Sequence, residues 1–329
     1  MLETAADARD FEALTAPYRR ELTVHCYRIL GSFEDAEDAL QEALVRAWRQ
    51  LSTLQSRAAL RAWLYRIATN VALNMLAARK ARGLPPALYP AADPRAPLPA
   101  ARPEALWLDP LPDEYLEGFI PGPEARLEAK ESVTLAFLTV LQRLPARQRA
   151  VLILRDVLGW SAQEVAEILD SSVAAVNSAL QRARATLKQP PNPRADTVAP
   201  AAPNPALLAE FVSAWEMADA GRLTALLRAD AVFSMPPLAA WFRGREAIRT
   251  FLAEQIFQPG QAGRQFRVRP TRANGAPAFA SYQRDAAGLY RPGALILLTL
   301  AGPQIAQIDD FLALDDRLFA RFHLPLSLD

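Results

Sequence analysis

Seven polar side chains in one stretch of the chain are of the types that proteins use to read DNA. Hydroxyl and amide groups can hydrogen-bond to base edges or phosphates, and guanidinium groups can neutralise phosphates. The seven residues are Ser171, Ser172, Asn177, Ser178, Gln181, Arg182 and Arg184. The sequence therefore predicts a DNA-binding surface, provided that one exposed helix presents these side chains to the major groove.

A pair of short helices joined by a tight turn would position them. We expect one helix over Ala146–Leu158, which has an apolar face and ends at Gly159 as a C-cap. Ser161 and Glu164 form a capping box that begins the next helix. After a turn at residues 170–172, a further helix runs from Val173 to about Leu187. This pattern predicts a helix-turn-helix, although a plain helical hairpin in a bundle would give the same periodicity.

The same stretch resembles a known family. The segment LPARQRAVLILRDVLGWSAQEVAEILDSSVAAVNSALQRARATL is similar to region 4 of the sigma-70 family, and closely so to its extracytoplasmic-function (ECF) group. Region 4 is the module that reads the promoter −35 element. The resemblance implies that the seven polar residues contact this element.

The segment GSFEDAEDALQEALVRAWRQL resembles sigma region 2.2. In this family, region 2.2 binds the clamp helices of the largest subunit of RNA polymerase. The resemblance implies that an acidic helix face meets the polymerase through Asp35, Asp38, Gln41 and Glu42. Without it, these side chains would be read as an ordinary solvated helix face.

The segment RAWLYRIATNVALNMLAARKAR resembles sigma regions 2.3 to 2.4, which hold flipped-out bases of the melted −10 element. That task needs aromatic stacking and cationic contacts to phosphates. The matching residues are Arg61, Trp63, Tyr65, Arg66, Asn70, Arg79 and Lys80. Trp63 could equally belong to the hydrophobic core.

The charges of the chain are segregated along it. The net charge is +1, which alone would argue against a nucleic-acid binder. Basic residues nevertheless gather around residues 79–82, 143–149 and 182–188, and acidic residues around 34–42 and 109–117. Separate basic and acidic faces suit a protein that binds DNA with one and a basic protein surface with the other.

The bulk composition is that of a globular, non-membrane protein. Of the 329 residues, 51% are hydrophobic and 22% charged, and this length predicts two or three compact units. No apolar run reaches the roughly 18 residues that span a bilayer. The single cysteine, Cys26, is interpreted as a buried apolar residue, so a cytoplasmic location without membrane contact is expected.

Two proline clusters divide the chain. The predicted organisation is a sigma region 2 helical bundle over residues 8–82, a proline-rich linker over 83–123, a region 4 helix-turn-helix over 124–189, a second linker over 190–205 and a C-terminal α+β domain over 206–329. By position, the first linker corresponds to the sigma segment that threads the polymerase active-site cleft and RNA exit channel. Trp107 and Leu108 favour docking over a free tether.

The C-terminal segment reads as helices at 206–218 and 223–227 followed by strand-like runs at 231–235, 265–270, 278–282, 294–300 and 305–311. It resembles the SnoaL-like branch of the NTF2-like fold, a cone of curved antiparallel sheet around a pocket. In a subgroup of sigma factors this domain is thought to act on the sigma core. The resemblance thus implies intramolecular contact between the C-terminal domain and the sigma modules.

A mostly apolar pocket is conceivable inside this cone. Its candidate lining residues are Trp215, Asp219, Phe233, Met235, Trp241 and Tyr282. SnoaL-like enzymes commonly use an Asp/His pair, but the two histidines are His25, in the first module, and His323, near the chain end. Regulation is therefore favoured over catalysis, with an ordinary hydrophobic core and a ligand-sensing pocket both left open.

The combined interpretation is a non-enzymatic ECF-type sigma factor that needs no cofactor and no metal ion. Its expected partners are core RNA polymerase, through the clamp helices and the flap, and promoter DNA at the −35 and −10 elements. Two alternatives stay open: a ligand-binding helix-turn-helix regulator that never engages polymerase, and a SnoaL-type isomerase or hydrolase with a DNA-binding appendage. The N-terminal module argues against the first, and the missing histidine argues against the second.

Overall fold

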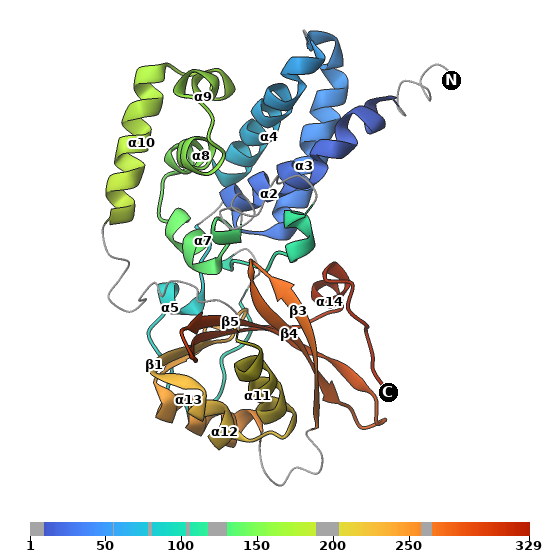
Figure 1. The fold of residues 1–329 in the computed structure, drawn as a ribbon, viewed down its shortest axis with the longest axis vertical. Coiled ribbons are helices and arrows are strands. Elements are labelled where there is room, and N and C mark those ends of the chain that lie inside the picture. The colour runs from blue at the N-terminus through green and yellow to red at the C-terminus, as the bar shows by residue number, and fades with distance from the viewer. Residues whose placement is uncertain are drawn as a thin grey trace. The chain divides into compact units, whose positions relative to one another are not determined.

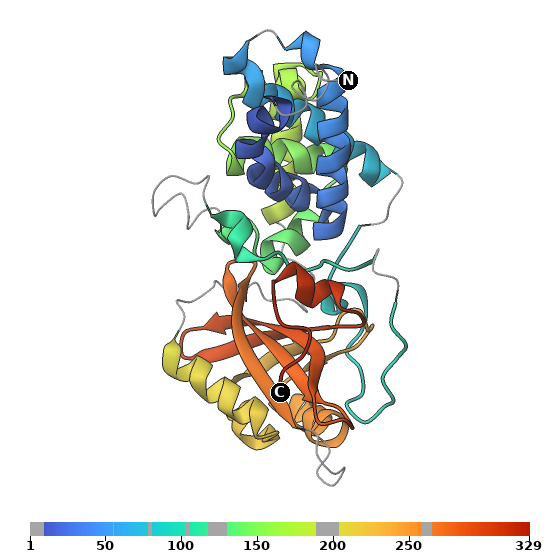
Figure 2. The ribbon, with the colours of Figure 1, turned by 90° about the vertical axis from the view of Figure 1, so that its right-hand side faces the viewer.

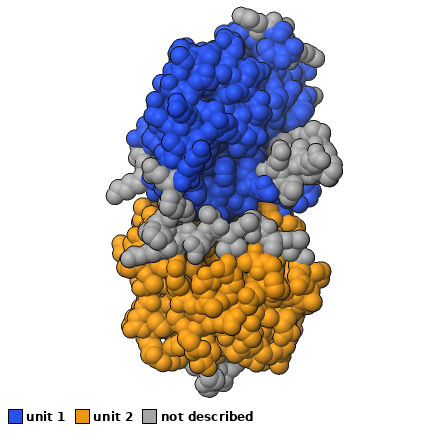
Figure 3. All heavy atoms as spheres, turned by 60° about the vertical axis from the view of Figure 1, so that its left-hand side comes forward, with its two compact units in different colours: residues 1–82, 108–191 blue, residues 83–107, 192–329 orange. Residues whose placement is uncertain are grey.

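The structure, a computed structural model, describes residues 10–54, 56–77, 81–102, 106–117, 130–188, 204–257 and 265–329. The chain forms two compact units, which are coloured separately in Figure 3. Unit 1 comprises residues 1–82 and 108–191, and unit 2 comprises residues 83–107 and 192–329. The proline-rich segment that follows the first helices is therefore shared between the two units.

Unit 1 is helical (Figure 1). Its principal helices are α2 (Arg19–Leu30), α3 (Phe33–Arg49), α4 (Leu60–Ala77), α7 (Leu135–Leu141), α8 (Ala146–Leu152), α9 (Ala162–Ile168) and α10 (Val173–Lys188). Helix α3 begins at Ser32, whose hydroxyl accepts a hydrogen bond from the Asp35 amide at 3.2 Å. Its small and apolar residues recur at helical spacing and are buried, which packs α3 against α2 and α4.

The helix-turn-helix forms where the sequence predicts it. Ser161 and Glu164 make the reciprocal capping box, with hydrogen bonds of 3.2 Å and 2.7 Å. Gly159 has a φ of 71°, the left-handed conformation expected of a C-cap glycine. The helix predicted over residues 146–158 differs in its second half, because its backbone widens into a π-helical turn at Ile153–Val157.

Unit 2 is an α+β domain, so the predicted fold class is confirmed (Figure 2). Its sheet has the order β2-β1-β6-β5-β4-β3, antiparallel except for the β1–β6 pair. The strands are β1 (Leu227–Ser234), β2 (Trp241–Arg243), β3 (Phe266–Ala273), β4 (Ala276–Arg284), β5 (Tyr290–Ala301) and β6 (Gln304–Leu312). The helices are α5 (Pro85–Leu88), α11 (Pro205–Glu216), α12 (Ala220–Ala225), α13 (Arg245–Phe251) and α14 (Arg317–Arg321).

The core of unit 2 lies between the curved sheet and helices α11 and α13. The Phe211 ring of α11 packs 5.4 Å from that of Phe279 on β4, and Trp215 donates from its indole Nε1 to Ser281 Oγ at 3.0 Å. Burial of these large aromatic side chains supplies the main driving force for the fold. No helix in the described parts of the chain has both the length and the apolar character needed to cross a bilayer.

The first part of the proline-rich segment packs on unit 2. The Ala92 amide donates to the Trp241 carbonyl at 2.9 Å, and the Trp241 indole Nε1 donates to the Tyr89 carbonyl at 2.9 Å. The Gln255 amide group donates to the Pro94 carbonyl at 2.7 Å. Side-chain donors on unit 2 thus satisfy backbone carbonyls of this segment, which would otherwise need water or backbone partners.

The second part packs on unit 1. Asp109 accepts hydrogen bonds from the Phe33 amide at 2.6 Å and from the Ser32 hydroxyl at 3.3 Å. The Tyr27 hydroxyl donates to the Asp109 carbonyl at 2.7 Å. Trp107 and Leu108, on either side of the division between the units, are 3% and 0% exposed. The described parts of this proline-rich segment are thus bound to folded surfaces of the chain itself.

Candidate nucleic-acid interface

Helix α10 separates its apolar and polar residues onto two faces. Val176, Leu180 and Ala183 are buried against α8 and α9. The predicted −35 contacts lie on the other face: Ser172, Asn177, Ser178, Gln181, Arg182 and Arg184 are exposed, and Ser171 is half-buried. This burial pattern leaves the polar face of α10 exposed to solvent, where double-stranded DNA can approach it.

Two of these residues already have local partners. The Ser172 hydroxyl accepts a hydrogen bond from the Ala175 amide at 3.2 Å and so stabilises the start of α10. Arg184 binds both carboxylate oxygens of Asp156, at 2.7 Å and 2.9 Å. The Asp156 carboxylate raises the pKa of Arg184 and fixes the orientation of its guanidinium group. Both side chains lie at the solvent-exposed surface.

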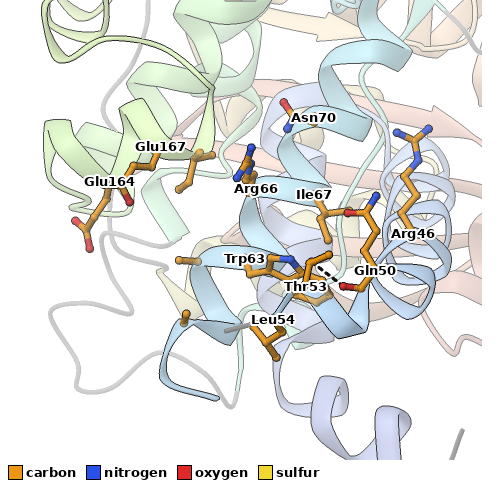
Figure 4. A pocket seen from close by; sticks show the side chains of 13 residues that line it. Arg46, Gln50, Thr53, Leu54, Trp63, Arg66, Ile67, Asn70, Glu164 and Glu167 are labelled. Carbon is orange, nitrogen blue, oxygen red and sulfur yellow. Dashed lines mark hydrogen bonds between the residues drawn. The ribbon is translucent and has the colours of Figure 1, made fainter. Parts of the chain in front are cut away.

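Three of the predicted −10 residues line one cleft. Trp63, Arg66 and Asn70 lie along α4 and border a space of about 670 Å³ (Figure 4). Arg46 of α3 and Gln50, which directly follows that helix, line the same space. An aromatic ring, two guanidinium groups and amide groups around a cleft of this size match the chemistry that holds an unstacked base and its phosphates, while Glu164 and Glu167 of α9 add two carboxylates to the same lining. Arg79 and Lys80 lie outside the described residues.

The other two predicted −10 residues are engaged within the protein. Arg61 pairs with Glu21, Nη2 to Oε2 at 2.9 Å. Its guanidinium group lies 5.1 Å from the ring centroid of Tyr65 and 5.3 Å from that of Trp160. Tyr65 is 1% exposed, and burial raises the pKa of its phenol, as does the nearby Glu21 carboxylate. Tyr65 therefore belongs to the core in this structure.

The predicted polymerase face on α3 is divided. Asp38, Gln41 and Glu42 are exposed. Asp35 is 7% exposed and pairs with Arg82 at 2.5 Å. Asp35 is therefore buried in an ion pair and does not lie on the exposed face with the other three.

The segment that contains α7 to α10 packs directly on α2 and α4. Buried Arg149 of α8 donates to the Ile29 carbonyl at 2.5 Å and to Gln142 Oε1 at 2.8 Å. Burial lowers the pKa of Arg149 to about 10. Arg28 donates to Ser132 Oγ at 2.7 Å. Sequence reasoning missed these contacts because no local pattern distinguishes a buried arginine from an exposed one.

The candidate pocket residues of unit 2 are dispersed. Trp215, Phe233 and Met235 belong to one buried cluster. Asp219 caps α12 by accepting from the Arg222 amide at 2.9 Å. Trp241 binds the proline-rich segment as described above, and Tyr282 packs on Phe319 of α14 with ring centroids 5.1 Å apart.

Unit 2 also contains two buried acids that sequence reasoning missed. Asp309 accepts hydrogen bonds from Ser234 Oγ at 2.5 Å and from Gln307 at 2.9 Å. Burial raises the pKa of Asp309 to about 6. Burial, and then the neighbouring Asp309, raises the pKa of Asp310 to about 7. The only sequence signal for these buried acids was that two consecutive aspartates stand in an otherwise apolar strand.

Three family models match the chain. Sigma-70 region 2 matches residues 14–82, Sigma-70 region 4 matches residues 134–187, and the SnoaL-like domain matches residues 208–322. Together with the exposed α10 face and the cleft along α4, these matches define a transcription initiation factor of the sigma-70 class.

Individual relatives show which group of sigma-70 factors the chain resembles. The ECF RNA polymerase sigma factor SigG of Mycobacterium tuberculosis is 44% identical over 328 residues, which are 98% of this chain and 86% of that protein. The ECF RNA polymerase sigma-E factor of Escherichia coli is 30% identical over 183 residues, 54% of this chain and 84% of that protein. The crystal structure of the M. tuberculosis ECF sigma factor SigJ has a TM-score of 0.57 at 22% identity, covering 97% of this chain and 99% of SigJ, and shows the same fold.

The chain belongs to the ECF RNA polymerase sigma factors with a C-terminal SnoaL-like domain. It is accordingly a non-enzymatic factor for transcription initiation. This membership rules out both alternatives weighed from the sequence, the polymerase-independent regulator and the SnoaL-type enzyme.

Proposed function

We propose that this sigma factor reads the −35 element with the exposed face of α10 and the melted −10 element with the α4 side of the cleft. Its C-terminal unit modulates initiation by holding residues 89–96 of the proline-rich segment. The observation that carries the modulation is the set of hydrogen bonds from Trp241 and Gln255 to that segment.

The physical basis of this modulation is that unit 2 and the polymerase compete for the same proline-rich segment. By its resemblance to other sigma factors, the proline-rich segment is expected to thread the polymerase. Its backbone carbonyls cannot be bound by unit 2 and lie in the polymerase channel at the same time. The ion pair between Arg95 and Glu254, at 3.3 Å, adds a salt-sensitive contribution to the bound state. Release of the segment is then a step that initiation requires.

Run-off transcription with core polymerase on a premelted promoter library tests this modulation. Three proteins are compared: the full chain, a chain ending at Lys188, and a full chain carrying Trp241→Phe and Gln255→Ala, which removes the side-chain donors. The matched control is Gln304→Ala, because this amide contacts the Leu227 carbonyl and not the proline-rich segment.

We expect more transcript from the truncated chain and an intermediate yield from the double variant, with the control equal to the full chain. Less transcript from the truncated chain would show that unit 2 assists initiation. Equal yields from all proteins would show that unit 2 does not modulate initiation on these templates, and no transcript from any of them would contradict the proposed promoter contacts.

We also propose that the exposed acids of α3 bind the clamp helices of the polymerase largest subunit and that the region 4 module contacts the flap. Asp38 and Glu42 are exposed on one helix face, where a basic partner can approach. Asp38→Lys with Glu42→Lys should weaken binding to core polymerase, whereas Glu131→Lys, at an exposed acid of the same unit outside α3, is the control for a general charge effect. Binding unchanged by the double reversal would contradict this contact.

A further inference from the structure

Strand β3, at one end of the sheet of unit 2, carries exposed arginines on its outer face (Figure 1). Val268 belongs to the buried core, so Arg267 and Arg269 point to the opposite face of the strand, and both are exposed. Arg284, at the end of β4, shares that face, because Tyr282 two residues earlier is the cross-strand partner of Arg267. We refer to Arg267, Arg269 and Arg284 as the arginine row.

None of the three arginines pairs with a carboxylate side chain in the part of the chain that the structure describes. Arg267 lies 4.5 Å from the ring centroid of Tyr290 and binds a backbone oxygen of Asp329. Arg284 donates to Gln265 Oε1 at 3.0 Å. Other arginines of unit 2 are bound to carboxylates, namely Arg95, Arg222, Arg228, Arg249 and Arg317. The positive charge of the arginine row is therefore directed to solvent.

Protection of the sheet edge does not account for the arginine row. Edge strands commonly carry charges that prevent pairing with another chain. The edge of β3 is already blocked, because Pro270 has no amide hydrogen and the Val268 amide donates to Glu216 Oε1 at 2.9 Å. Asp285, next to Arg284 in the chain, binds Arg291 instead, at 3.1 Å. The arginine row is thus available to a partner outside unit 2.

We propose that the arginine row binds the phosphate backbone of double-stranded DNA beside the −35 element. Guanidinium groups on one face of a strand can bind phosphates in this way without reading the sequence. Duplex DNA is favoured over an acidic protein surface, because a sigma factor acts on promoter DNA and this polyanion is present whenever α10 is bound. The inference rests on the proposed −35 role of α10.

The covalent connection keeps unit 2 within reach of that DNA. Helix α10 ends at Lys188 and α11 begins at Pro205, so 16 residues, 189–204, connect them. A chain of this length spans at most roughly 55 Å in any conformation. Once α10 is bound, the arginine row therefore meets the flanking duplex at a high effective concentration.

The test measures binding of the full chain to a fluorescein-labelled DNA duplex of random sequence, by anisotropy over a series of salt concentrations. The main variant combines Arg267→Gln, Arg269→Gln and Arg284→Gln. A second variant has lysine at the same three positions, which keeps the charge. The matched control removes the same charge from arginines of unit 2 that already bind carboxylates: Arg228→Gln, Arg249→Gln and Arg317→Gln.

The expected signature is a change in salt dependence. Each phosphate that an arginine neutralises releases counterions and adds about 0.9 to the slope of log K against log salt concentration. The glutamine variant should therefore lose about 2.7 of this slope and bind about tenfold or more weakly at low salt. The lysine variant and the control should keep the slope of the parent.

An unchanged slope in the glutamine variant, or an equal loss in the control, would overturn the proposal. Loss of binding in the lysine variant would also overturn it, because altered folding of unit 2 would then explain the effect without its charge. Tighter binding of labelled polyglutamate than of the duplex would show that the arginine row suits an acidic protein instead of DNA.

Arg182→Gln with Arg184→Gln separates failure of the arginine row from failure of the −35 assignment. If this change weakens duplex binding while the glutamine variant of the row matches the parent, α10 binds DNA and the proposal for unit 2 is wrong. If it has no effect while the row variant binds more weakly, the −35 assignment itself fails.

Discussion

At the scale of single residues, His25 shows how burial controls a titratable group. It is fully buried in unit 1, and its Nε2 lies 2.8 Å from Thr69 Oγ1. Burial, and then the nearby Arg28 and Arg61, lower the pKa of His25 to about 3. The unfolded chain binds a proton near pH 6.5 and the folded unit does not, so unit 1 loses stability as the pH falls below 6.5.

His25→Asn should remove most of this pH dependence. Between about pH 8 and pH 5.5 the parent should lose about 1 kcal/mol of unfolding free energy in unit 1 through His25, and the variant should not. Urea unfolding at the two pH values measures the difference between the slopes. Parallel pH profiles for variant and parent would contradict a neutral buried imidazole.

Asp310 changes the stability of unit 2 with pH in the opposite direction from His25 in unit 1. Its Oδ1 receives no hydrogen bond from the described residues, and its folded-state pKa of about 7 lies above that of an unfolded aspartate. The folded unit therefore binds the proton more tightly, and stability falls as the pH rises through about 7.

Asp310→Asn should consequently make unit 2 less sensitive to pH. The parent should lose about 2 kcal/mol between about pH 5.5 and pH 8 through this group, and the variant should lose much less. Ser234→Ala provides the contrast, because it removes a hydrogen bond to Asp309 and leaves Asp310 ionisable. A full pH slope in Asp310→Asn would show that another group is responsible.

The chemistry of the candidate site could be predicted from residue types, but the pairings of its residues could not. The sequence identified an acidic helix and cationic residues on α4. It could not show that Asp35 pairs with Arg82 or that Arg61 pairs with Glu21. Each pair joins residues 40 or more positions apart, and such contacts depend on how the helices pack.

At the scale of elements, the linker residue Asp109 supports α3. Its carboxylate accepts from the backbone amide of Phe33 at 2.6 Å, at the positive end of the helix dipole. Asp109→Ala should therefore destabilise unit 1 by about 1 kcal/mol, the usual value of an N-terminal cap. Asp109→Asn keeps an acceptor and should cost less. Equal stability of parent and Asp109→Ala in urea unfolding would contradict this role.

The types of the secondary-structure elements could be predicted from local sequence signals. Their exact boundaries and the packing of the proline-rich segment could not. The capping box at Ser161 and the glycine at position 159 located the turn of the helix-turn-helix because each has a local physical cause. The predictions missed the strand β2, since its three residues are too few to show the alternation that marks a strand. The proline content indicated an extended segment, but only tertiary packing determines which carbonyls find donors on unit 2.

At the scale of the whole molecule, the two units have separate cores and should unfold as separate cooperative transitions. His25 lies in unit 1 and Asp310 in unit 2. From about pH 8 to pH 5.5, the transition of unit 1 should therefore move to lower temperature and that of unit 2 to higher temperature.

Differential scanning calorimetry of the full chain at the two pH values measures both shifts in one sample. The variants assign the transitions, because His25→Asn should reduce the shift of one of them and Asp310→Asn the shift of the other. A single transition, or two that move in the same direction, would mean that the units are thermodynamically coupled. In that case release of the proline-rich segment by unit 2 would also change the stability of the sigma modules, and its effect on initiation would extend beyond exclusion from the polymerase channel.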